Sequence, residues 1–77
     1  MRKGIVLSYN KSVKSGFIKD LSGQRIRFYN EDLNVGFKPN DLVAFNVSVV
    51  KGAIVAVNII LILNKNGKTV SSRHNTN

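Results

Sequence analysis

The sequence predicts a small all-β barrel formed by a single domain. Its 77 residues leave no room for a second domain. Short segments rich in β-branched or alternating apolar residues are separated by clusters of Gly, Asn, Ser and Pro. No segment repeats its apolar residues with a helical period. Several short strands joined by such turns are typical of a small barrel.

The first three strands are expected before residue 30. Residues 3–10 form the first and end at the polar run Asn10-Lys11-Ser12. Residues 15–20 form the second. The turn Ser22-Gly23-Gln24 then leads into a third strand over residues 25–29, and Asp20 is expected to cap this turn.

A connection and a long hairpin complete the predicted barrel. Residues 30–41 form the connection, in which Glu31-Asp32-Leu33 has the composition of one short helical turn. Residues 42–63 have the length of a membrane-spanning helix, and their only charge is Lys51. Alternation from residue 43 to 49, many β-branched residues and the turn pair Lys51-Gly52 favour two strands instead.

The end of the hairpin breaks the alternation. Ile59-Ile60-Leu61-Ile62-Leu63 is apolar on both faces of a strand. Either a neighbouring subunit covers this edge, or the tail or the connection covers it locally. Residues 64–77 contain too little apolar surface to offset the entropy of ordering, so residues 1–63 are expected as the folded domain and residues 64–77 as a flexible basic tail.

Charge indicates the class of partner. Twelve Lys and Arg against four Asp and Glu give a net charge of +8 and a pI of about 10.4. Such a balance favours a polyanion, nucleic acid before an anionic membrane, although a merely solvated basic surface is a further interpretation. The absence of cysteine excludes disulfides and thiolate metal sites and suits a cytoplasmic location.

The residues needed for catalysis are missing. The four acidic residues are scattered over turns and the connection, and the only histidine, His74, lies in the expected tail. Acid–base catalysis and metal binding both need clustered groups, and a phosphate-binding loop needs clustered glycines. We therefore expect no enzyme activity, no metal or cofactor, and no small-molecule substrate.

Alternation assigns the faces of the second and third strands. Ile26 and Phe28 are expected in the core, while Arg25, Arg27 and Tyr29 face solvent. The same rule places Ile18 inside and Ser15 and Phe17 outside. Aromatic rings can stack on bases, and nearby Lys and Arg can neutralise phosphates. The alternative is that Phe17 is partly covered core and the cations are solvated.

These segments resemble the cold-shock domain family over about residues 2–62. The resemblance is carried by Gly4-Ile5-Val6, Tyr9-Asn10, Gly16-Phe17-Ile18, Ile26 to Tyr29, and Ala56 to Ile59. It implies a five-stranded antiparallel OB-fold barrel. It also implies binding of single-stranded RNA or DNA through two ribonucleoprotein motifs, in an RNA chaperone or a regulator of transcription or translation.

The chain departs from this family where bases would stack. Four family aromatic positions hold Ser8, Ser15, Arg27 and Asn30. Each lost base stack is worth about 1–3 kcal/mol, so stacking is weakened. Residues 1–63, without the tail, contain nine basic and four acidic residues. Binding is therefore expected to depend more on charge.

The predicted nucleic-acid contacts combine aromatic and basic residues. Tyr9, Phe17 and Tyr29 are expected to stack on bases, and the resemblance adds the loop pair Phe37-Lys38; Lys11, Lys14, Arg25 and Arg27 are expected to hold the backbone. The predicted partner is single-stranded RNA or DNA, with RNA favoured, bound by a monomer or weak homodimer. The competing prediction is a protein-interaction or dimerisation module that uses the apolar strand edges.

Overall fold

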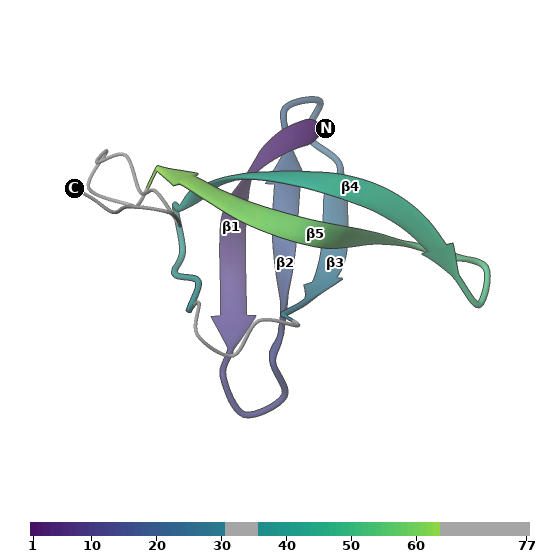
Figure 1. The fold of residues 1–77 in the computed structure, drawn as a ribbon, viewed down its shortest axis with the longest axis horizontal. Coiled ribbons are helices and arrows are strands. Elements are labelled where there is room, and N and C mark those ends of the chain that lie inside the picture. Colours follow the sequence, from purple (N-terminus) through teal and green to yellow (C-terminus); the bar gives the residue numbers. More distant parts are fainter. Residues whose placement is uncertain (31–35, 64–77) are drawn as a thin grey trace.

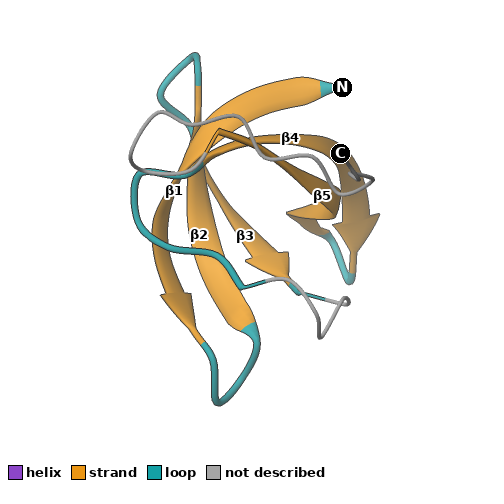
Figure 2. Cartoon of the chain, turned by 60° about the vertical axis from the view of Figure 1, so that its left-hand side comes forward, coloured by secondary structure: helices purple, strands orange, loops and turns teal. Residues whose placement is uncertain are grey.

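The computed structural model describes residues 1–30 and 36–63, which form five strands and no helix (Figures 1 and 2). The strands are β1 (Arg2–Asn10), β2 (Ser15–Asp20), β3 (Arg25–Tyr29), β4 (Leu42–Val50) and β5 (Ala53–Leu63). They close into a barrel in the order β1-β2-β3-β5-β4, with β4 returning to β1. The predicted all-β barrel is confirmed, whereas the predicted helical turn at 31–33 and the tail at 64–77 lie outside the described residues.

The expectation of a purely antiparallel barrel is wrong. β3 and β5 pair in parallel through Arg27 with Val55 and Phe28 with Ala56, while the other four strand pairs are antiparallel. The reason is geometric, because strand direction cannot alternate all the way around a closed ring with an odd number of strands. One neighbouring pair must therefore run parallel.

The strand boundaries agree closely with the prediction. β2 and β3 have the expected limits, and β1 begins one residue earlier, at Arg2. Lys51 and Gly52 have φ angles of 51° and 80° and join β4 to β5. Two positive φ angles define the hairpin turn whose twist matches that of paired strands. Residues 42–63 are therefore two strands, and none of the described residues belong to a helix that could cross a membrane.

The core lies between the strands and collects the inward apolar side chains. Ile18, Ile26 and Phe28 are buried, as the alternation predicted. The buried cluster consists of Val6, Ile18, Ile26, Phe28, Phe37, Val43, Phe45 and Ala56. Four partly buried residues pack against this cluster: Tyr9, Val47, Ile59 and Leu61.

Two irregularities in β5 explain the broken alternation near its end. The pairing moves from Asn46–Val57 to Ala44–Ile60, and then from Val43–Leu61 to Leu42–Leu63. At each step β5 contains one residue more than β4, and an extra residue reverses which face the next side chains occupy. Apolar side chains consequently appear at successive positions of one strand.

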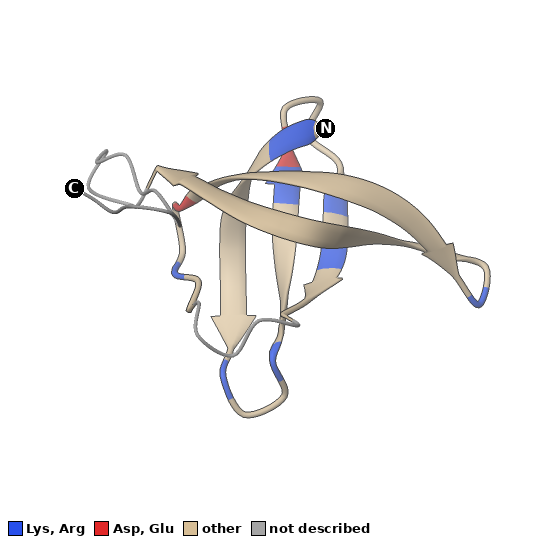
Figure 3. Cartoon of the chain, in the orientation of Figure 1, with Lys and Arg blue, Asp and Glu red and all other residues tan. Residues whose placement is uncertain are grey.

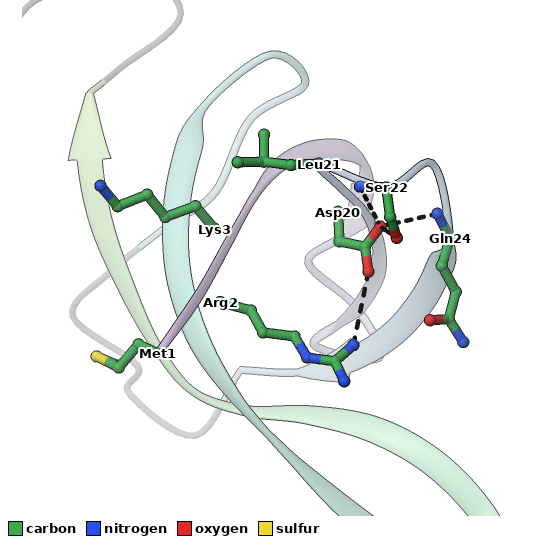
Figure 4. A pocket seen from close by; sticks show the side chains of 7 residues that line it. All are labelled: Met1, Arg2, Lys3, Asp20, Leu21, Ser22 and Gln24. Carbon is green, nitrogen blue, oxygen red and sulfur yellow. Dashed lines mark hydrogen bonds and ion pairs between the residues drawn. The ribbon is translucent and has the colours of Figure 1, made fainter.

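The β2–β3 turn is held by a carboxylate (Figure 4). Asp20 Oδ1 accepts hydrogen bonds from the backbone N–H and the hydroxyl of Ser22, at 3.0 and 2.7 Å, and from the backbone N–H of Gln24, at 2.8 Å. Arg2 lies 3.6 Å from the other carboxylate oxygen. These bonds, above all that from the Ser22 hydroxyl, lower the pKa of Asp20. The predicted capping role is confirmed.

Candidate nucleic-acid interface

The outward surface of β1, β2 and β3 is ordered by their pairing, and we call it the outer face. Cross-strand neighbours stand side by side, so residues in register form rows across the sheet. The rows are Ser8–Phe17–Arg27, Asn10–Ser15–Tyr29 and Lys19–Arg25. The predicted residues Phe17, Arg25, Arg27 and Tyr29 therefore share one face.

Phe17 lies on the middle strand of this face, and two arginines reach over its ring. The guanidinium carbons of Arg25 and Arg27 are 4.8 and 4.6 Å from the centroid of its ring. At this range the cation is attracted to the ring electrons. Arg25 and Arg27 reach the same ring because they are two residues apart on β3, with Arg27 directly opposite Phe17. The contact holds both charges close to the ring, which is itself half-buried.

Ser15 also belongs to the outer face, but its surroundings differ from the prediction. Only 7% of the residue is exposed, although alternation placed it toward solvent. An N–H group of Arg27 donates a hydrogen bond of 3.1 Å to Ser15 Oγ. The long arginine side chain thus lies partly over the short serine and is held at both Ser15 and Phe17.

Further cations lie around Phe17 and its two arginines (Figure 3). Lys11 and Lys14 are exposed on the loop between β1 and β2. Lys19 is exposed on β2, in register with Arg25, and was not among the predicted contacts. Its position two residues after Phe17 was the sequence signal that could have identified it, since alternate residues share a strand face. Tyr29 completes this face, with 52% of the residue exposed.

Tyr9 and Phe37 are placed differently from the other predicted aromatics. The Tyr9 ring stacks on Phe28 at 5.8 Å, and its hydroxyl accepts a hydrogen bond from Asn30 Nδ2 at 2.9 Å. Phe37 is 5% exposed and meets Tyr9 and Phe28 edge-on. Phe37 is thus a core residue in this structure, and one side of Tyr9 is occupied by the core.

Lys38 lies outside the rows of the outer face. It is exposed on the connection before β4, where its backbone N–H donates to Asp41 Oδ2 at 2.9 Å. The following residues bind back to β1, because Asn40 N–H donates to the Val6 carbonyl and Val6 N–H donates to the Asp41 carbonyl. The structure therefore does not bring Lys38 into register with the arginines.

The described residues form a hollow beside the Asp20 turn and another on the outer face. One lies beside the Asp20 turn and is lined by Met1, Arg2, Lys3, Asp20, Leu21, Ser22 and Gln24 (Figure 4). The other opens on the outer face and is lined by Ser8, Tyr9, Asn10, Val13, Ser15, Gly16, Phe17 and Arg27. No cluster of His, Asp or Glu able to hold a metal occurs in residues 1–30 and 36–63.

No protein-family model matches the chain, and no curated protein matches it significantly.

Proposed function

We propose that this chain is a divergent cold-shock-like OB barrel that binds single-stranded nucleic acid, RNA in preference to DNA, on its outer face. The observation that supports this most is the ring of Phe17, which lies within 5 Å of two guanidinium groups beside the exposed Tyr29. OB barrels bind oligonucleotides on the face of their second and third strands and on adjacent loops. The cluster occupies the corresponding strands here.

Each part of the outer face has a distinct task in this proposal. Phe17 and Tyr29 provide apolar surfaces on which bases stack. Arg25, Arg27 and Lys19 neutralise phosphates along the strand, and Lys11 and Lys14 extend this track onto the β1–β2 loop. Tyr9 and Phe37 stabilise the outer face from the core, because their rings pack on Phe28 of β3.

The first test is binding of a short pyrimidine-rich oligonucleotide at low salt, followed by fluorescence anisotropy. Phe17→Ala should weaken binding by about five- to 150-fold, which corresponds to loss of one stacked base at about 1–3 kcal/mol. Ile54→Ala is a matched control, since Ile54 is an exposed apolar residue on the β4–β5 hairpin. Its affinity should stay unchanged, and circular dichroism should show both variants folded.

A second candidate function is self-association, and one feature of the structure favours it. β1 pairs with β4 only from Leu42 to Phe45, so among the described residues the rest of β4 is bonded to β5 alone. Val49, Val50 and Ile54 are exposed on this part of the hairpin, which extends beyond β3 (Figure 1). An apolar edge strand of this kind can pair with the same edge of a second copy.

The two candidates make opposite predictions for the native chain. Sedimentation should give a monomer or a weak dimer if nucleic-acid binding is the function. A stable dimer that binds no oligonucleotide at low salt would refute the binding proposal and support the interaction module.

A further inference from the structure

The hollow on the outer face exists because small residues occupy the surface between β1 and β2. Ser8 and Ser15 supply little side-chain volume on this face, and the larger Phe17, Tyr9 and Val13 also line the hollow. The bulge between Val6 and Ser8 brings Ser8 into register with Phe17. The surface of β1 and β2 beside the Phe17 ring is therefore recessed rather than flat.

Two polar side chains that line this recess, Arg27 and Asn10, have N–H donors besides those used in their bonds within the protein. Arg27 donates from one terminal nitrogen to Ser15 Oγ, which leaves the other N–H groups of a planar, forked guanidinium. Asn10 Oδ1 accepts from the backbone N–H of Ser12 at 2.9 Å, so the amide offers its Nδ2 donors. A ligand with two acceptors on one edge matches these donors.

We infer that this recess, on the proposed nucleic-acid-binding surface, takes one guanine base of the bound strand and that Arg27 selects it. Guanine presents O6 and N7 as adjacent acceptors, which a forked arginine can bind with two hydrogen bonds. Adenine places an amino donor beside its N7 and is rejected by the same group. Val13, Phe17 and Ser15 line the same recess, beside the Arg27 guanidinium.

The inference predicts a preference for guanine that depends on its O6 and N7 atoms. The probe is a short oligouridylate in which one central uridine is replaced by guanosine, inosine, adenosine or 7-deazaguanosine. Guanosine should bind about fivefold or more tightly than adenosine, the lower end expected for a two-bond contact. Inosine retains O6 and N7 and should equal guanosine. In 7-deazaguanosine the N7 acceptor is lost, so most of the gain in affinity over the adenosine strand should disappear.

Three variants separate this contact from general binding. Arg27→Lys retains the charge but loses the fork, so the guanosine preference should disappear. Arg25→Lys is the matched control on the same strand, and it should retain the preference because Arg25 does not line the recess. Ser8→Trp fills the recess from an exposed position and should abolish the preference.

The outcomes distinguish this inference from the proposed function. Equal affinity for the oligouridylate and its four substituted forms, with binding retained, would overturn the guanine site and leave nucleic-acid binding intact. Equal loss of preference in Arg25→Lys and Arg27→Lys would also overturn it. No binding to any strand at low salt would overturn the proposed function and the guanine site together.

Discussion

Neutralising Arg25 should change how oligonucleotide binding responds to salt. Five exposed cations lie on the outer face or on its adjacent loop: Lys11, Lys14, Lys19, Arg25 and Arg27. Each phosphate contact with a single strand contributes about −0.7 to the slope of log affinity against log salt. Five contacts give a slope of about −3.5, so affinity should fall about a hundredfold between about 50 and 200 mM salt.

Arg25→Gln should reduce this slope to about −2.8, because one phosphate contact is lost. The matched control is Lys51→Gln, which removes the same charge at the tip of the β4–β5 hairpin, away from β2 and β3 (Figure 3). Its slope should equal that of the native chain. Fluorescence anisotropy with an oligouridylate over a series of salt concentrations measures both slopes.

Two results would refute this reasoning. A native slope near zero would show that phosphate contacts do not contribute to binding. An equal decrease of the slope in Lys51→Gln and Arg25→Gln would show that the strand responds to total charge rather than to the outer face.

The remaining predictions concern the stability of the barrel. In Gly16→Ala the new Cβ would clash with the Ser8 carbonyl oxygen and lie 2.8 Å from the Phe28 ring. The free energy of unfolding should therefore fall by about 3 kcal/mol or more, and Tm by about 12 °C or more. Gly36→Ala is the control, because the space around Gly36 is open, and its free energy of unfolding should stay within about 1 kcal/mol of the native value. Equal melting temperatures would contradict the packing. The lowered pKa of Asp20 means that its stabilisation is complete above the ordinary pKa of 3.8 and is lost as pH falls through the lower folded-state pKa. Acid titrations followed by circular dichroism should thus show a smaller loss of stability below pH 3.8 in Asp20→Asn than in the native chain, and identical acid dependence would contradict this role.

The strand boundaries could be predicted because their signals are local. β2 and β3 begin and end where alternation meets turn residues, and the Lys51-Gly52 pair marks the β4–β5 turn. The parallel pairing of β3 with β5 is different, because it follows from closing the ring and from no local pattern. The two extra residues in β5 likewise became visible only when its register with β4 was known.

The candidate site was predicted in part. Alternation placed Arg25, Arg27 and Tyr29 on the outer face, since the direction of a side chain follows directly from its place in a strand. It could not show that Phe37 packs into the core or that Arg27 covers Ser15. Both depend on residues distant in the chain.

The sequence by itself determined a basic, cysteine-free chain of short strands with aromatic and cationic residues on one strand face. Composition and alternation are sufficient for this, because each depends only on residue identity and near neighbours. Only the tertiary structure decided that two guanidinium groups lie over the Phe17 ring and that Ser8, Ser15 and Gly16 border a recess. These features arise from the register of three strands, which barrel closure and long-range packing set together.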